Sequence, residues 1–220
     1  MPSRVALASA VALVLGIVGM LALHVIPPTD EISPMRRTLS QYALTSNKWL
    51  FDLAVLLVAL GSALAFCAAV AARRLAFYAG PVVLGVLWIA SLLVIVTFTK
   101  TDWTVGPSLG GVIHRYASAV GFVALPLAVI TMARRVLPDQ PASRAAARGF
   151  AGVSLAWFGL IVVGVVRMAL GYGPWWLFVP LGLTERVIAL TAVAALLTLA
   201  LGMARKPRDE VVPGDLLSAA

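Results

Sequence analysis

The sequence predicts an all-α integral membrane protein built as a bundle of six transmembrane helices. Of its 220 residues, 61% are hydrophobic and only 12% are charged, whereas a soluble domain is about half apolar and a quarter charged. Six apolar runs are each long enough to cross the ~30 Å hydrocarbon core of a bilayer as a helix. Because lipid does not satisfy open backbone polar groups, six such runs are expected to pack as helices against one another.

The six runs follow one another along almost the whole chain. They cover residues 5–26, 49–72, 78–99, 110–132, 150–171 and 183–204. The first run is longer than the ~7–15 residues of a signal-peptide core, so we expect an uncleaved helix there. We expect one membrane domain over residues 1–204 and a short polar cytoplasmic tail over 205–220. The longest connection, residues 29–50, is expected to carry a short amphipathic piece on the outer membrane surface.

Basic residues predict the orientation of the bundle. The second, fourth and sixth runs each end in alanine followed by two basic residues, at 72–74, 133–135 and 204–206. The connection between the fourth and fifth runs adds Arg144 and Arg148. Cytoplasmic loops carry an excess of lysine and arginine, so both termini are predicted to be cytoplasmic.

Charge and cysteine content exclude several classes of function. The net charge is +8, but most cations flank apolar runs, where they orient helices and contact lipid headgroups, so no nucleic-acid partner is expected. The single cysteine, Cys67, excludes a disulfide framework and a cysteine-based metal site within one chain. The sequence contains no HExxH, Walker, dinucleotide or Gly-x-Ser-x-Gly motif, so we predict no metal and no cofactor.

Ionisable residues inside or at the ends of the apolar runs gather on the predicted outer side. They are His24, Asp52, Asp102, His114, Arg115, Arg167, Glu185 and Arg186. A charge at mid-membrane costs ~2.5–3.5 kcal/mol on insertion scales, so such groups pair or face an aqueous cavity. The sequence therefore predicts a polar cluster at the outer end of the bundle. Arg167 and Arg186 are expected to pair with acidic members of this set, and both histidines to line the same cavity.

The fifth run carries a stripe of small residues at helical spacing. Gly152, Ala156, Gly159, Val163 and Arg167 share one helix face. Small residues mark places where membrane helices approach closely. The stripe therefore predicts that Arg167 points into the bundle.

Two residues of the cluster are candidates for chemistry and the others for binding. His114 and Asp102 are candidate catalytic groups for proton transfer. The candidate ligand-binding residues are Arg167, Arg186, Arg115, Glu185, Asp52, His24, Ser40 and Tyr42. Three structural alternatives stay open: a hydrogen bond from His114 to a neighbouring helix, an Arg115 that reaches to headgroups, and an ion-pair network around Glu185.

Three stretches resemble a known family. They are TLSQYALTSNKWLFDLAVLLVALGSAL (38–64), FTKTDW with GGVIHRYASAVGF (98–122), and GLTERVIALTAVAALL (182–197). They resemble the DUF998 family of six-helix prokaryotic membrane proteins. The family motif falls on Ser40, Tyr42, Asp102, Gly111, His114, Gly182, Leu183 and Arg186. The resemblance implies the six-helix topology and a prokaryotic plasma membrane, and it implies no substrate, cofactor or reaction, because the activity of the family is unknown.

These observations together lead to one functional hypothesis and two alternatives. The hypothesis is a polar, outward-facing pocket that binds or processes an anionic lipid or lipid-linked molecule, with arginines holding the headgroup. The first alternative is a small transporter, which needs a site near mid-membrane with access to both faces. The second is a non-enzymatic accessory protein whose charges lock the bundle. Membrane lipids are the expected partners; a protein partner, the oligomeric state and enzymatic activity stay open.

Overall fold

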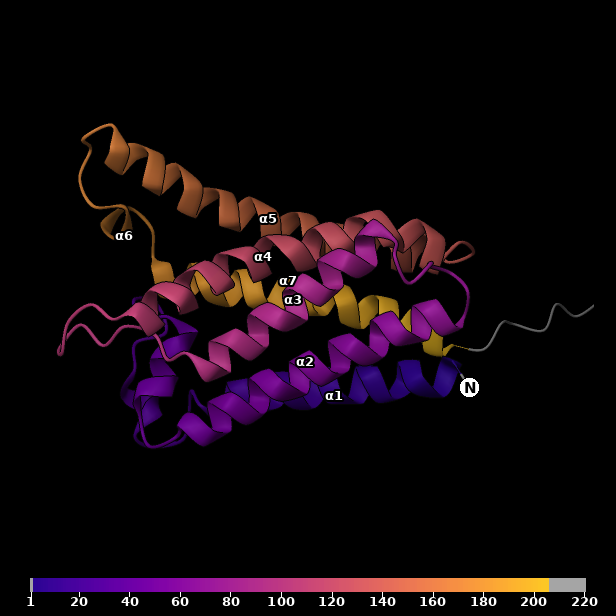
Figure 1. Ribbon diagram of the computed structural model, residues 1–220, viewed down its shortest axis with the longest axis horizontal. Coiled ribbons are helices and arrows are strands. Elements are labelled where there is room, and N and C mark those ends of the chain that lie inside the picture. Colours follow the sequence, from indigo (N-terminus) through magenta and orange to yellow (C-terminus); the bar gives the residue numbers. More distant parts are fainter. Residues whose placement is uncertain (1, 206–220) are drawn as a thin grey trace, which may run out of the picture.

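A computed structural model describes residues 2–205, and in this part the predicted six-helix architecture is confirmed. Figure 1 shows the long helices lying along one another in an elongated bundle. The helices that are long and apolar enough to cross a membrane are α1 (Pro2–Ala22), α2 (Lys48–Ala71), α3 (Gly80–Thr97), α4 (Leu109–Val136), α5 (Pro141–Ala169) and α7 (Leu181–Ala204). Apart from Arg205, the predicted polar tail lies outside the described residues.

The bundle has two ends of different character. The connections 23–47, 98–108 and 170–180 lie at one end, which we call the loop end, and they contain the short helices η1 (Thr29–Glu31), η2 (Leu39–Leu44) and α6 (Trp175–Phe178). The start of α1 and the end of α7 lie at the opposite end, which we call the terminal end (Figure 1). Among the described residues, the basic pairs 73–74 and 134–135 and Arg205 also lie at the terminal end. That the terminal end is cytoplasmic stays a prediction.

The helix at 141–169 begins earlier than its apolar run predicts. Proline at the first position of α5 suits a helix start, because its missing N–H would have no intrahelical partner there. The following ASRAAAR stretch, residues 142–148, is rich in strong helix formers. Hydropathy marks only the part of a helix that suits lipid, so α5 extends beyond it at the terminal end.

Small residues let α1 and α2 pack closely. A Cβ on Gly16 would lie 2.7 Å from Val58 Cγ2, and one on Gly61 would lie 2.8 Å from Leu13 Cγ. The hydroxyl of Ser9 donates to the Gly61 carbonyl oxygen over 2.7 Å. Close backbone approach of this kind is the usual basis of helix packing in membranes.

The helix α5 lies at the edge of the bundle. It packs against α4 and α7, and the Ser154 hydroxyl donates to the Ile188 carbonyl oxygen over 3.1 Å. In an apolar 18-residue stretch of α5 only 17% of the residues are buried, against 50% in the corresponding stretch of α2. Figure 1 shows the loop-end half of α5 leaning away from the other helices.

The predicted packing stripe on α5 is wrong. Gly152 and Ala156 are exposed, and a Cβ added at Gly152 or Gly159 would meet nothing within 4 Å. The buried face of this helix instead carries Ala147 and Ala151. Spacing shows which residues share a face, but it does not show which face meets the bundle, and lipid accepts small residues as readily as large ones.

The connection between α1 and α2 also differs from expectation. The short helix η2 was expected to lie on the membrane surface, but Ser40, Tyr42 and Ala43 are buried. The segment packs against α2 and α7 at the loop end. Its position follows from contacts with the start of α7, which no periodicity within residues 29–50 encodes.

Candidate functional site

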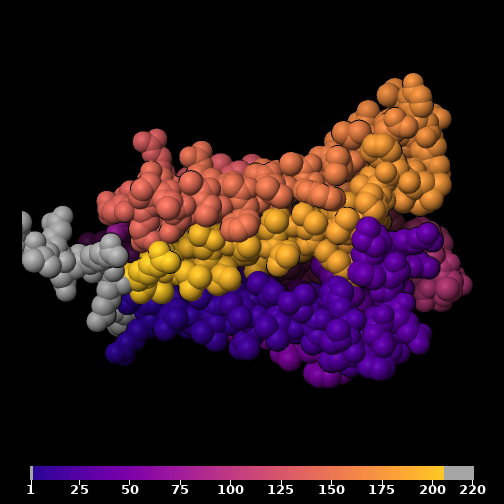
Figure 2. All heavy atoms as spheres, turned by 180° about the vertical axis from the view of Figure 1, so that it is seen from behind, coloured from indigo at the N-terminus to yellow at the C-terminus, as the bar shows by residue number. Residues whose placement is uncertain are grey.

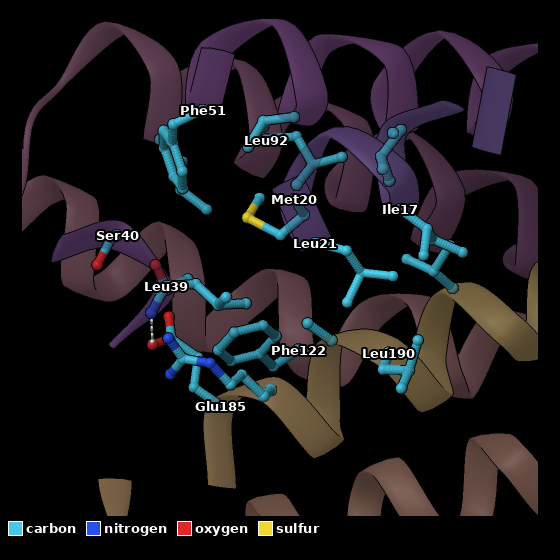
Figure 3. A pocket seen from close by; sticks show the side chains of 18 of the residues that line it. Ile17, Met20, Leu21, Leu39, Ser40, Phe51, Leu92, Phe122, Glu185 and Leu190 are labelled. Carbon is cyan, nitrogen blue, oxygen red and sulfur yellow. Dashed lines mark hydrogen bonds between the residues drawn. The ribbon is translucent and has the colours of Figure 1, made fainter. Parts of the chain in front are cut away.

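A cavity of about 320 Å³ lies in the loop-end half of the bundle, among α1, α2, α3, α4, α7 and η2. Its volume is at the lower end of the range for ligand pockets. Figure 3 shows side chains from these elements surrounding the hollow. The lining residues are Gly16, Ile17, Met20, Leu21, His24, Leu39, Ser40, Phe51, Val55, Val58, Trp88, Leu92, Ile95, His114, Ser118, Phe122, Glu185, Arg186, Ala189, Leu190 and Val193.

Polar and apolar lining residues occupy different depths of the cavity. The polar residues nearest the loop end are His24, Ser40, His114, Glu185 and Arg186. Deeper along the same helices the lining becomes apolar. From Arg186 to Val193 the helix rises by ~10 Å. The polar residues therefore border the cavity at the loop end, although the surface that faces the cavity is almost entirely apolar.

The cavity opens sideways between α1 and α7. Leu21 of α1 and Leu190 of α7 both line it, and they are also 58% and 53% exposed on the outside of the bundle. Figure 2 shows this side, where α7 in yellow and α1 in indigo border a recess beside the first connection. The surface around the opening is apolar, so in a membrane it faces acyl chains.

Residues 34–42, which we call the roof segment, cover the loop end of the cavity. The backbone N–H of Leu39 donates to Glu185 Oε2 over 2.8 Å, and that of Gly182 donates to the Met35 carbonyl oxygen over 3.1 Å. A Cβ on Gly182 would lie 2.5 Å from the Arg37 carbonyl oxygen, so only glycine allows this approach. The first two turns of α7 thus hold the roof segment in place.

The guanidinium of Arg186 provides most of this attachment. Its Nε donates to His24 Nε2 over 2.8 Å, and its Nη2 donates to the Tyr42 hydroxyl over 2.9 Å. Its Nη1 donates to the carbonyl oxygens of Pro34 and Arg37 over 2.9 and 2.7 Å. Between residues 2 and 205 no carboxylate forms an ion pair with Arg186, so the predicted acidic partner is replaced by neutral acceptors.

Lys100, in the connection between α3 and α4, holds the roof segment from the other side. Its Nζ donates to Thr38 Oγ1 over 2.8 Å and to Gln41 Oε1 over 3.0 Å. Burial lowers the pKa of Lys100 below its ordinary value, although the Glu185 carboxylate opposes the shift. The partners of its ammonium group are neutral, so its positive charge is left uncompensated by a direct ion pair.

His114 is both a structural residue and a lining residue. Its ring Nδ1 lies 2.7 Å from the Phe98 carbonyl oxygen, just beyond the end of α3. A carbonyl oxygen only accepts, so neutral His114 carries its proton on Nδ1 and presents Nε2 as an acceptor. The ring is buried, with 4% exposed, and it lines the cavity. The expected hydrogen bond to a neighbouring helix and the expected position in the cavity therefore occur together.

The predicted pair of His114 with Asp102 is not formed. Asp102 lies in the loop outside the cavity, where its Oδ1 accepts from Thr104 N over 3.0 Å and from Thr104 Oγ1 over 2.7 Å. These hydrogen bonds hold the pKa of Asp102 below its ordinary value. Arg115 is exposed, and its guanidinium carbon lies 6.0 Å from the centre of the Trp103 ring. Both side chains are satisfied locally, so neither turns toward the cavity.

Arg167 and Asp52 also lie outside the predicted cluster. The guanidinium of Arg167 stacks over the rings of Tyr172 and Phe178, 5.1 and 4.7 Å from their centres. Asp52 forms an ion pair with Lys48, one turn earlier on α2. The expectation that Arg167 and Arg186 share one polar cluster is therefore wrong: α5 diverges from the bundle where Arg167 lies.

The part of the chain that matches a known family includes both the cavity lining and the roof segment. Residues 6–202 match the family described as "Protein of unknown function (DUF998)". The chain belongs to this family. The resemblance inferred from the sequence is thereby confirmed, and the protein is an integral membrane protein of a family without assigned function. No curated protein and no solved structure matches this DUF998 chain.

Polar residues were a useful guide in this DUF998 protein, but the apolar lining was missed. His114, Ser118 and Phe122 follow one another at four-residue intervals and line the cavity together. That spacing was available in the sequence, although nothing in it distinguishes a lining phenylalanine from a core phenylalanine. Within the described residues, no group of three or more potential ligands is placed to hold a metal ion.

Proposed function

We propose that this protein binds a membrane amphiphile by enclosing one of its apolar chains, with the polar head at the loop end. The observation that carries the proposal is the sideways opening between Leu21 and Leu190 into an apolar cavity that titratable residues border only at its loop end. A lipid in one leaflet has its head at the membrane surface and its chain toward the middle. In the cavity, the titratable residues at the loop end correspond to the lipid head, and the apolar depth corresponds to its chain.

The charges around the roof segment favour an anionic head. Lys100 lies within electrostatic range of two arginines and two carboxylates, and the cavity lining adds one further arginine. These side chains are Lys100, Arg37, Arg115, Arg186, Glu185 and Asp102. Basic groups are in excess, and positive potential near a membrane surface attracts phosphate-bearing heads. A phosphate group beside Lys100 would also compensate its charge.

The depth of the cavity favours binding from one membrane face over transport. Buried Leu13 of α1 and Leu196 of α7 lie about one turn beyond the last lining residues of these helices, on the way to the terminal end. The cavity is thus bounded by the packed core rather than continued by a path through it. His114 lacks a carboxylate hydrogen-bond partner among the described residues, so we propose binding and presentation of the amphiphile rather than its chemical conversion.

A substitution that fills the cavity tests this proposal. Ala189 lines the cavity on α7, whereas Ala156 is exposed on the outer face of α5. We therefore compare Ala189→Phe with the matched control Ala156→Phe, each purified in nanodiscs, and quantify retained lipid by native mass spectrometry. We expect Ala189→Phe to lower lipid occupancy by about tenfold or more, equivalent to ~1.4 kcal/mol, and Ala156→Phe to match the wild type. Equal lipid content in all three folded proteins contradicts the proposal.

A further inference from the structure

At the level of His114 and Ser118, the side chains that line the cavity offer hydrogen-bond acceptors. With its proton held on Nδ1 by the Phe98 carbonyl oxygen, His114 offers Nε2 as an acceptor. One turn further along the lining, the Ser118 hydroxyl donates to the carbonyl oxygen of His114 over 2.9 Å, so its oxygen is also left to accept. Acceptors in apolar surroundings are costly to leave unpaired. The complementary ligand therefore brings a donor to this level.

The position of these acceptors identifies which part of a lipid lies beside them. His114 is close to the start of α4, and Phe122, eight residues later, lines the apolar depth ~12 Å away along the helix. Lys100 lies in the loop before α4 and contacts the roof segment. A head near Lys100 and a chain toward Phe122 place the junction between head and chain at His114.

Two kinds of lipid differ at this junction. In a two-chain glycerolipid the junction carries ester groups, whose oxygens only accept, so they would face the acceptors of His114 and Ser118 without a donor. In a single-chain lipid with one chain removed, the same carbon carries a free hydroxyl, which donates. A site that offers only acceptors discriminates strongly against a ligand that lacks the hydrogen-bond donor. It discriminates less between ligands that differ only in chain length.

We propose that the cavity selects a single-chain lipid with a free hydroxyl beside its head, the chemistry of a lysophospholipid, and that His114 Nε2 accepts the hydrogen bond from that hydroxyl. This inference rests on the proposed function and names the substrate class of the same site. The apolar chain occupies the space between α1 and α7, and the hydroxyl pairs with the acceptor that the protein leaves open. His114 is then a specificity-determining residue as well as the link between α4 and the end of α3.

The decisive experiment changes the ligand and leaves the protein intact. Wild-type protein in nanodiscs is titrated with 1-acyl lysophosphatidylglycerol, with its analogue in which the free hydroxyl is methylated, and with diacyl phosphatidylglycerol. We expect the first to bind about tenfold more tightly than either of the others, the factor that one hydrogen bond to an otherwise unpaired buried group supplies. Equal affinity for the hydroxyl and methyl-ether forms overturns the inference.

Variants separate this result from the proposed function. His114→Phe removes the acceptor and should make the hydroxyl and methyl-ether forms bind equally. Ser118→Ala, which leaves the bond of the His114 ring to Phe98 in place, should reduce the preference about threefold. Ala189→Phe should abolish binding of every probe. If Ala189→Phe abolishes binding while the wild type does not distinguish the probes, the inference fails and the proposed function stands. If Ala189→Phe binds all probes as the wild type does, both fail.

Discussion

Arg186 and Arg167 have similar positions in the sequence pattern and different surroundings in the structure. Each lies inside an apolar helix near the loop end, and each was expected in the same polar cluster. The hydrogen bonds of Arg186 reach five acceptors, four of them outside its own helix. Arg167 instead lies over two aromatic rings on a helix that leans away from the bundle. An in-helix arginine therefore predicts that something compensates it, but not what.

The helix dipole accounts for part of the difference. Arg186 lies in the second turn of α7, near the positive end of the dipole, so it needs strong acceptors from elsewhere. The carbonyl oxygens of the roof segment supply them. Arg167 lies in the last turn of α5, where a cation is favoured by the dipole. Contact with aromatic faces is sufficient there, because the local backbone already attracts the charge.

The largest expected effect is that of removing Arg186. Arg186→Ala leaves the Pro34 and Arg37 carbonyl oxygens and the Tyr42 hydroxyl without their charged donor, and hydrogen bonds to charged groups contribute about 1.5–3 kcal/mol each. We expect the free energy of unfolding to fall by about 3–5 kcal/mol and bound lipid to be lost, because the roof segment detaches. Thermal unfolding in nanodiscs, followed by tryptophan fluorescence, measures the first effect.

A conservative variant shows whether charge or geometry matters at this position. Arg186→Lys keeps the charge but replaces the planar fork with a single ammonium group. Because the acceptors lie around different nitrogen atoms of Arg186, lysine should recover no more than about half of the lost stability. Full recovery of stability in Arg186→Lys would contradict the role described for the planar guanidinium group.

The second comparison uses two glycines, one on each helix. Gly182→Ala places a Cβ 2.5 Å from the Arg37 carbonyl oxygen and 2.6 Å from that of Pro34, so the roof segment must move. We expect a loss of about 1–3 kcal/mol. Gly159→Ala meets nothing within 4 Å on the lipid-facing side of α5. It should be neutral or stabilising by up to ~1 kcal/mol, because alanine favours the helix.

The two glycine variants are measured by the same unfolding assay. A Gly182→Ala protein as stable as Gly159→Ala would show that the roof segment does not depend on close contact with α7. Lipid occupancy provides a second readout, since only Gly182 adjoins the roof segment over the cavity.

Most of the fold could be predicted from the sequence, because the spanning helices follow directly from the order of apolar and polar segments along the chain. Six apolar runs interrupted by polar connections are sufficient to place six spanning helices, and the ends moved mainly where polar residues continue a helix, as at 141–149. Which face of a helix packs against the rest of the bundle is less predictable. On α5 the Gly152 stripe and the Ala147 face are equally regular, and only the packing of the other helices decides between them.

The site could be predicted only in part, for a related reason. His24, His114, Glu185 and Arg186 do line one cavity, because a buried polar group is costly to leave facing lipid on its own. Asp102 did not follow this rule, because a loop residue has backbone and hydroxyl partners close by in the chain. The contacts of the roof segment join residues about 150 positions apart, and no spacing within one helix encodes them.

The next prediction, with a smaller expected effect, concerns Arg167. Arg167→Ala removes contacts with two aromatic rings at a half-buried position, and cation–π contacts contribute about 0.5–1 kcal/mol at exposed sites and ~2 when desolvated. We expect a loss of about 1 kcal/mol in unfolding free energy and no change in lipid occupancy. If Arg167→Ala lowers lipid occupancy as much as Ala189→Phe does, the separation of α5 from the binding site is wrong.

The smallest effect is expected at Asp102, and it depends on pH. Hydrogen bonds from Thr104 favour the ionised form and hold the pKa of this carboxyl below the ordinary 3.8. The folded protein therefore binds this proton less readily than the unfolded chain does, so the contribution of Asp102 to stability is present above pH 3.8 and is lost as the pH falls through the depressed pKa. Asp102→Asn lacks this titration but keeps an oxygen for Thr104. Unfolding curves of the two proteins should run parallel from pH 8 to ~5 and converge only in stronger acid, and the affinity for an anionic lipid should not fall in the variant. A lipid affinity that falls in Asp102→Asn near pH 7 would instead place this carboxylate beside His114 in the bound state.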